Sequence, residues 1–154
     1  MAEHLSLAAS KPVVVRGGRS VDDRGSLGYI NGFPLNDFKR FYTVQNHQQG
    51  FIRAWHGHLI ERKAITVLRG TALICAVRMT DKTRPSQQEE VHRFVLSESP
   101  TDALVIPAGY ANGFMTLTAN ALLLIFSTTS LEESLNDDFR FPFDYWNPWT
   151  ITPR

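Results

Sequence analysis

The stretch Gly50-Phe-Ile-Arg-Ala-Trp-His-Gly-His-Leu-Ile-Glu-Arg-Lys-Ala-Ile-Thr-Val-Leu-Arg-Gly70 combines a strand pattern with the densest polar chemistry of the chain. On a strand, His56 and His58 point to the same face together with Ile52 and Ala54, because side chains alternate at every second residue. Two imidazoles that face into a β-barrel are a pattern typical of metal ligands, so the neighbouring residues decide what the pair does.

The segments around this stretch are short apolar runs rich in β-branched and aromatic residues. Ala64–Leu68 and Thr71–Met79, joined by an Arg69–Gly70 turn, predict a hairpin. Many short strands separated by turn residues predict an antiparallel sandwich or barrel. Helix is nearly absent, and the best candidate begins at Ser130, where Glu133 completes a capping box. The other strand candidates are Val13–Val15, Phe41–Val44, His92–Leu96, Ala103–Ile106, Gly113–Leu117 and Ala121–Thr128.

The composition is that of one globular domain, and we expect residues 1–154 to form it. A chain of 154 residues is long enough for one sizeable core and too short for two. The 16 Lys and Arg residues balance 15 Asp and Glu residues, so neither nucleic acid nor an acidic membrane is expected as a partner. The single cysteine, Cys75, forms no internal disulfide, and neither a signal peptide nor a membrane span is recognisable. We therefore expect a soluble, cytoplasmic protein.

The spacing of the histidine pair resembles the first motif of the cupin superfamily, in which a glycine, five residues and His-X-His precede a metal-binding glutamate. Gly50, His56 and His58 fit this motif, but the glutamate position holds Lys63. In the second motif, Asn112 stands where the last metal-binding histidine would be. A protonated lysine repels a divalent cation and has no lone pair to donate. We therefore expect an all-β, cupin-type double-stranded β-helix (jelly roll) with minimal helix and no metal.

A more specific match runs from about Asp22 to Arg140-Phe-Pro-Phe-Asp144, over nearly the whole chain, and five segments before that last one carry most of it. They are Asp22-Asp-Arg-Gly25, Gln45-Asn-His47, Gly50-Phe-Ile-Arg-Ala-Trp-His56, Lys63-Ala-Ile-Thr-Val-Leu-Arg-Gly70 and Ile106-Pro-Ala-Gly-Tyr-Ala-Asn-Gly-Phe114. In this order they resemble motifs of the dTDP-4-dehydrorhamnose 3,5-epimerase family. Each match alone is weak, but together they are fairly specific for nucleotide-sugar epimerases.

The resemblance implies an isomerase that inverts C3, C5 or both centres of a nucleoside-diphospho-4-keto sugar. Hydrogens at C3 and C5 flank the ketone, so removal of one leaves an enolate with its charge on O4. Return of the proton to the opposite face inverts the centre, and no cofactor is required. By the resemblance, His56 is the base, Lys63 stabilises the enolate, and Asp144 orients His56. Asp138 is the fallback for that orienting carboxylate.

The substrate-binding residues that we expect are Arg24, Gln45, Asn46, Arg53, His58 and Asn112, the last two replacing the family's Gln and His. Strict alternation puts Arg53 on the face opposite His56, so either a bulge between them or a role at a subunit interface is required. The expected partners are a dTDP- or GDP-linked sugar and a second copy of the chain. The family pairs as dimers that exchange N-terminal strands, and Val13–Val15 is compatible with such a strand.

The chain departs from the family at its general acid. The family has a tyrosine in a Leu-Tyr-Lys-Thr-Thr segment, and here Phe126 takes that place. Two alternatives to the epimerase therefore stay open. The His56–His58 pair resembles the NDP-4-keto-6-deoxyhexose 3,4-ketoisomerases, and loss of the acid is compatible with an inactive cupin that binds a sugar nucleotide. The groups that could replace the acid are Tyr42, Tyr110, Tyr145, His58 and water.

Overall fold

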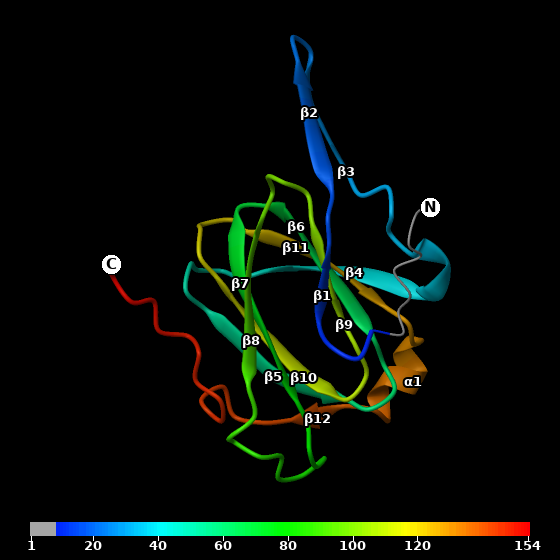
Figure 1. The fold of residues 1–154 in the computed structure, drawn as a ribbon, viewed down its shortest axis with the longest axis vertical. Helices are drawn as coiled ribbons and strands as arrows, with labels where there is room; N and C mark the ends of the chain where they lie inside the picture. The colour runs from blue at the N-terminus through cyan, green and yellow to red at the C-terminus, as the bar shows by residue number, and fades with distance from the viewer. Residues whose placement is uncertain (1–8) are drawn as a thin grey trace.

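Two five-stranded antiparallel sheets face each other and form the body of the protein (Figure 1). The structure is a computed structural model that describes residues 9–154. The first sheet has the order β1 (Val13–Val15), β9 (Ala103–Ile106), β6 (Lys63–Arg69), β11 (Leu122–Ser127) and β4 (Arg40–Gln45). The second has the order β12 (Phe139–Arg140), β5 (Ile52–His58), β10 (Tyr110–Thr116), β7 (Thr71–Arg78) and β8 (Val91–Ser97). The expected double-stranded β-helix is confirmed.

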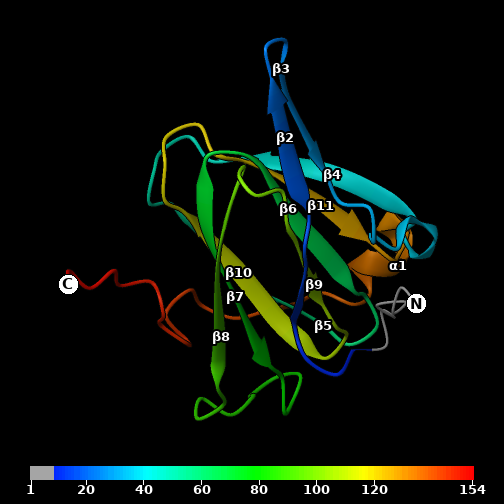
Figure 2. The same cartoon turned by 45° about the horizontal axis from the view of Figure 1, so that its top comes forward.

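The remaining elements are few. Strands β2 (Gly18–Asp22) and β3 (Gly25–Tyr29) form a hairpin that projects from the body (Figures 1 and 2). A short 3-10 helix, η1 (Leu35–Asp37), precedes β4, and helix α1 (Leu131–Leu135) follows β11. The capping box predicted at the start of α1 is confirmed, because the Ser130 hydroxyl accepts from the Glu133 amide while the Glu133 carboxylate accepts from the Ser130 amide. Within residues 9–154, no helix is long and apolar enough to cross a membrane.

The hairpin predicted from Ala64 to Met79 is wrong. Strand β6 pairs with β9 and β11 in one sheet, and β7 pairs with β10 and β8 in the other, so the turn between them crosses from sheet to sheet. Gly70 makes this tight crossing possible: its φ is +75°, and an added Cβ would lie 2.3 Å from Thr118 Oγ1. A local strand–turn–strand pattern does not reveal which sheet each strand joins.

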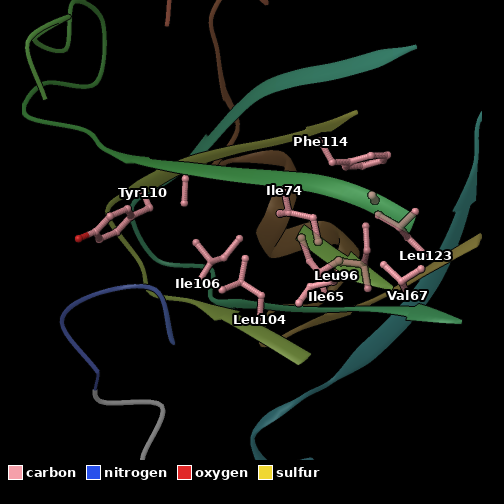
Figure 3. Close-up of a cluster of buried hydrophobic side chains, with 12 residues drawn as sticks. Ile65, Val67, Ile74, Leu96, Leu104, Ile106, Tyr110, Phe114 and Leu123 are labelled. Atoms are coloured by element: carbon pink, nitrogen blue, oxygen red, sulfur yellow. The ribbon is translucent and has the colours of Figure 1, made fainter. Parts of the chain in front are cut away.

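An apolar core fills much of the space between the sheets (Figure 3). Both layers contribute side chains that are almost completely buried: Ile65, Val67, Leu104 and Leu123 from the first sheet, and Ile74 and Leu96 from the second. Burial of one such side chain is worth roughly 1.5–3 kcal/mol, so this apolar core supplies much of the stability of the fold.

Candidate active site

A cavity of about 320 Å³ lies between the sheets, beside the apolar core. Its walls come from β4, β5, β6, β10 and β11 and from the segment of α1 to β12. Five of the expected site residues line it together: Arg53, His56, His58, Lys63 and Asn112. Residues far apart in the chain are thus brought to one place by the pairing of the strands.

Arg53 and His56 share the cavity because β5 is irregular between them. Asn112 of β10 pairs with His56 and Phe114 pairs with Arg53, so three steps along β5 oppose two steps along β10. This extra residue is a β-bulge, one of the two explanations that the alternation of side chains left open for Arg53. Opposite the bulge the backbones approach closely, and a Cβ on Gly113 would lie 2.4 Å from the Ala54 Cβ.

The imidazole of His56 is held in its neutral form. Burial, followed by the charges of Lys63 and Arg140, lowers the pKa of His56 from 6.5 to about 4, against the opposing effect of Asp138. The ring is therefore neutral at physiological pH. The side-chain amide of Asn112 donates from Nδ2 to the backbone carbonyl of His56 at 3.2 Å, which links β10 to β5 at this point.

His58 is held in one tautomer. Its Nδ1 lies 2.6 Å from the carbonyl oxygen of Asp137 and 3.0 Å from Glu61 Oε2. Both are acceptors, so Nδ1 carries the proton and Nε2 is an acceptor in the neutral ring. Burial and the charge of Lys63 lower the pKa of His58, although Glu61 opposes them, so this ring too is neutral.

The donor set of the cavity does not fit a metal ion. The Lys63 side chain is 11% exposed, and its Nζ lies 3.9 Å from Glu61 Oε2. An ammonium there would repel a divalent cation, and His58 Nδ1 is committed to its hydrogen bond with the Asp137 carbonyl. Within the described part of the chain, no group of three His, Cys, Asp or Glu residues could hold a metal ion.

The two candidates for the orienting carboxylate lie in different places. Asp138 lines the cavity, and its Oδ2 accepts from Arg140 Nε at 2.9 Å. Asp144, the residue chosen from the sequence, is exposed and does not line the cavity. The structure thus favours the fallback, because β12 pairs with β5 and brings the residues next to Arg140 against His56.

Three of the expected binding residues also lie outside the cavity. Arg24 is at the tip of the projecting hairpin, where it pairs with Asp22. Gln45 is exposed at the end of β4. The side-chain amide of Asn46 donates to the backbone carbonyl of Phe51 at 3.0 Å. A motif match therefore does not show which residues of one chain meet.

Phe126 does not occupy the place of an acid in this cavity. Its ring packs on the outside of the first sheet, with its centroid 4.9 Å from that of Phe33 and 5.6 Å from that of Phe38. The cavity-lining neighbour on β11 is Ile125, which pairs with Tyr42 of β4. Tyr42 lines the cavity as well, beneath the Arg40 guanidinium at 5.2 Å from its ring centroid.

The other tyrosines named as replacements for the acid are occupied elsewhere. The Tyr110 hydroxyl donates to the Ser10 carbonyl at 3.2 Å, and the Tyr145 hydroxyl donates to the Pro85 carbonyl at 2.6 Å. Tyr42 and His58 are the members of that set in the cavity.

Sequence reasoning missed two cations of the cavity, Arg40 and Arg140, and one buried acid beneath it, Glu61. Alternation along β4 places Arg40 on the face of Tyr42 and was the available signal for it. Arg140 lies on a two-residue strand, and Glu61 lies in the turn between β5 and β6, where no periodicity applies. With Arg53 and Lys63, the two arginines make the cavity strongly cationic.

A double-stranded β-helix with a cationic, histidine-bearing cavity between its sheets defines a cupin-type protein suited to an anionic ligand. The family model of dTDP-4-dehydrorhamnose 3,5-epimerase matches residues 30–140. The chain belongs to this family, whose members are isomerases that act on sugar nucleotides. A comparison with curated protein sequences finds no match.

Solved structures with the same fold include both kinds of enzyme considered above. The dTDP-4-dehydrorhamnose 3,5-epimerase from Bacillus anthracis, with TDP and PPi bound, is 19% identical over 92% of this chain and 86% of that one, with a TM-score of 0.73. The 3,4-ketoisomerase QdtA from Thermoanaerobacterium thermosaccharolyticum, in complex with TDP, is 19% identical over 88% of this chain and 92% of that one, with a TM-score of 0.66. At such identities the likeness establishes the fold alone.

Proposed function

We propose that the chain is a metal-independent epimerase that inverts C3, C5 or both centres of a nucleoside-diphospho-4-keto sugar through an enolate. The observation that carries this proposal is the presence of the His56 imidazole and the Lys63 ammonium in one cavity. A neutral base and a fixed cation are what proton abstraction beside a ketone needs. A substrate carbonyl takes the place that a metal ion takes in other cupins.

The positions of His56 and Tyr42 on opposite sides of the cavity determine which group takes and which group gives the proton. His56, on the second sheet, takes the proton from carbon, and the electron pair moves into the enolate, whose charge on O4 is stabilised by the Lys63 ammonium. Tyr42, on the first sheet, gives its hydroxyl proton to the same carbon from the other side. Inversion needs a donor and an acceptor on opposite faces of the ring, and residues of opposing sheets supply them. Asp138 replaces Asp144 as the carboxylate that supports charge on His56.

The cations at the edge of the cavity suit the diphosphate. Arg53 and Arg140 line the cavity and also an adjoining pocket of about 340 Å³ that includes His56. Planar guanidinium groups bind phosphate oxygens in a bidentate manner. The similar solved structures include complexes with TDP and with TDP-4-keto-6-deoxyglucose, which supports a dTDP-linked substrate; a GDP-linked sugar is the second candidate.

We propose further that the working unit is a homodimer. Within the described residues, β2 and β3 pair only with each other, and Val21 and Leu27 are 75% and 63% exposed. A lone two-stranded hairpin is marginally stable in water, so contact with a second copy would bury its apolar side chains. Arg24 at its tip would then reach the cavity of that copy, which is the role expected of it from the sequence.

A specific observation supports the 3,4-ketoisomerase as a second candidate. His56 and His58 both line the cavity from the same strand, β5. Two neutral imidazoles in one cavity suit the two transfers that this isomerisation needs, of the C3 proton to C4 and of the O3 proton to O4. The reaction product distinguishes the two candidates.

Incubation with dTDP- and GDP-linked 4-keto-6-deoxy sugars in heavy water, followed by NMR, tests the proposal. Deuterium at C3 or C5 with inversion supports the epimerase, and a ketone moved to C3 supports the ketoisomerase. Tight binding without incorporation from any substrate would indicate an inactive sugar-nucleotide-binding protein.

Tyr42→Phe is expected to slow inversion by about 10²-fold or more, the usual contribution of a general acid. Loss of activity on exhaustive chelation, restored by one metal ion, would contradict the metal-free mechanism.

A further inference from the structure

The most deeply buried ionisable group beside the cavity has no part in the reaction described above. The carboxylate of Glu61 is completely inaccessible and does not line the cavity, although it lies in the turn between His58 and Lys63. Removal of a carboxylate from water costs several kcal/mol unless charged or hydrogen-bonding partners surround it. Its partners therefore indicate why the chain keeps a charge there.

Each oxygen of Glu61 has its own set of partners. Oε1 accepts a hydrogen bond from the Ser127 hydroxyl and lies 3.4 Å from Arg40, so this side is anchored to β11 and β4. Oε2 lies 3.0 Å from His58 Nδ1 and 3.9 Å from Lys63 Nζ, which belong to β5 and β6. The carboxylate thus joins strands of both sheets and lies beside three groups that line the cavity, those of Arg40, His58 and Lys63.

The turn that carries Glu61 is itself fixed by the segment after α1. The buried carboxylate of Asp137 accepts from the amides of Leu59, Ile60 and Glu61 at 2.8, 3.0 and 2.8 Å. The Asp137 carbonyl accepts from His58 Nδ1. The position of Glu61 is therefore determined from the backbone outward, as expected of a group whose placement matters to about half an ångström.

We propose that Glu61 is a positioning residue, which holds the Lys63 ammonium beside the substrate carbonyl and fixes the orientation of the His58 ring. This inference rests on the proposed function, because it assigns Glu61 a role in the same reaction. Oε2 forms no hydrogen bond among residues 9–154, so a small movement of Lys63 brings its ammonium onto this oxygen. The Lys63 ammonium then lies between the Glu61 carboxylate on one side and the substrate O4, where negative charge develops, on the other.

The variant Glu61→Gln keeps the shape and removes the charge. We expect kcat to fall about 10-fold to 100-fold, as is typical when the outer partner of a functional group is lost. KM should change little, because Glu61 does not touch the substrate. Ser127→Ala is the matched control: it removes the anchor of Oε1 but leaves the charge and the partners of Oε2 in place. Its kcat should stay within about twofold of wild type.

A double-mutant cycle separates positioning from simple structural support. In the background of Lys63→Gln, Glu61→Gln should lower kcat by no more than about twofold, because the group it positions is already gone. Persistence of the full loss in that background would overturn the proposal, as would wild-type kcat in folded Glu61→Gln. If Glu61→Gln does not fold, Glu61→Asp replaces it in the cycle, since it keeps the charge but draws the carboxylate back by one methylene; the same two outcomes decide.

A measurement without substrate keeps this inference distinct from the proposed function. The His58 Nδ1 proton lies between a carbonyl and a carboxylate, so its NMR signal should be shifted downfield and exchange slowly. The signal should move upfield in Glu61→Gln and stay in place in Ser127→Ala. An unmoved signal in Glu61→Gln would overturn the positioning role. A wild-type protein with this signal but no exchange activity would instead overturn the proposed function.

Discussion

The two ends of the barrel interior are built from the same strands but filled with different chemistry. Along one face of β6, Lys63 lines the cavity whereas Ile65 and Val67 belong to the apolar core. On the neighbouring strand β11, Ser127 contacts the buried Glu61 and Leu123 is part of the core. Phe114 and Ile125 belong to the core and also line the cavity, so a few polar residues on each strand separate the stabilising end from the reactive end.

The comparison teaches where each end gets its properties. The apolar end excludes water by packing, and its side chains need no specific partner. The cavity end buries charges, so each charged group depends on others at defined distances. Substitutions at the two ends should therefore affect different measurements, and this separation can be tested.

The largest expected effect is that of His56→Gln at the cavity end. We expect the rate of deuterium exchange into the sugar to fall by about 10²–10⁴-fold, because the general base is lost. The thermal midpoint should change little, since His56 is only partly buried. Retention of most of the exchange activity would remove His56 as the base and weaken the distinction between the two ends.

Ile65→Ala tests the apolar end of the same interior. Ile65 is 1% exposed, so its truncation should lower the free energy of unfolding by about 2–5 kcal/mol in a urea titration. The kcat of the protein that remains folded should equal that of wild type. A large loss of kcat without loss of stability would show that the two ends are not independent.

The pH dependence of wild-type activity sharpens the description of the cavity. Burial lowers the pKa of His56 to about 4, and the base must be neutral to accept a proton. We expect kcat/KM to stay level as the pH falls from neutrality, and to decrease about tenfold per unit below pH 4. A midpoint at 6.5 would mean that the free enzyme holds His56 in a water-like environment.

The smallest effect is expected for Phe126→Tyr. The ring packs against Phe33 and Phe38 outside the barrel, so an added hydroxyl does not enter the cavity. Exchange rates should match wild type, and stability should change by no more than about 0.5 kcal/mol if the hydroxyl meets water. A second inverted centre in this variant would show that Phe126 reaches the substrate after all.

Several features of the fold and site could be predicted from local patterns. Alternation placed His56 and His58 on one interior face, and the conflict between Arg53 and His56 called for either a bulge or an interface role, of which the structure contains the bulge. The capping box at Ser130 depends on residues three apart and was equally predictable. Each of these rests on geometry within one element, which the backbone period determines.

The sequence by itself determined the fold class, the family and the face of the histidines, because strand period, turn residues and motif order are local properties of the chain. Tertiary structure alone decided that β6 and β7 join different sheets, that Asp138 rather than Asp144 lines the cavity, and that Tyr42 lines it while Phe126 does not. The physical reason is that strand register and sheet order arise from packing between distant segments. A cavity wall assembled across such segments has no signature in any one of them.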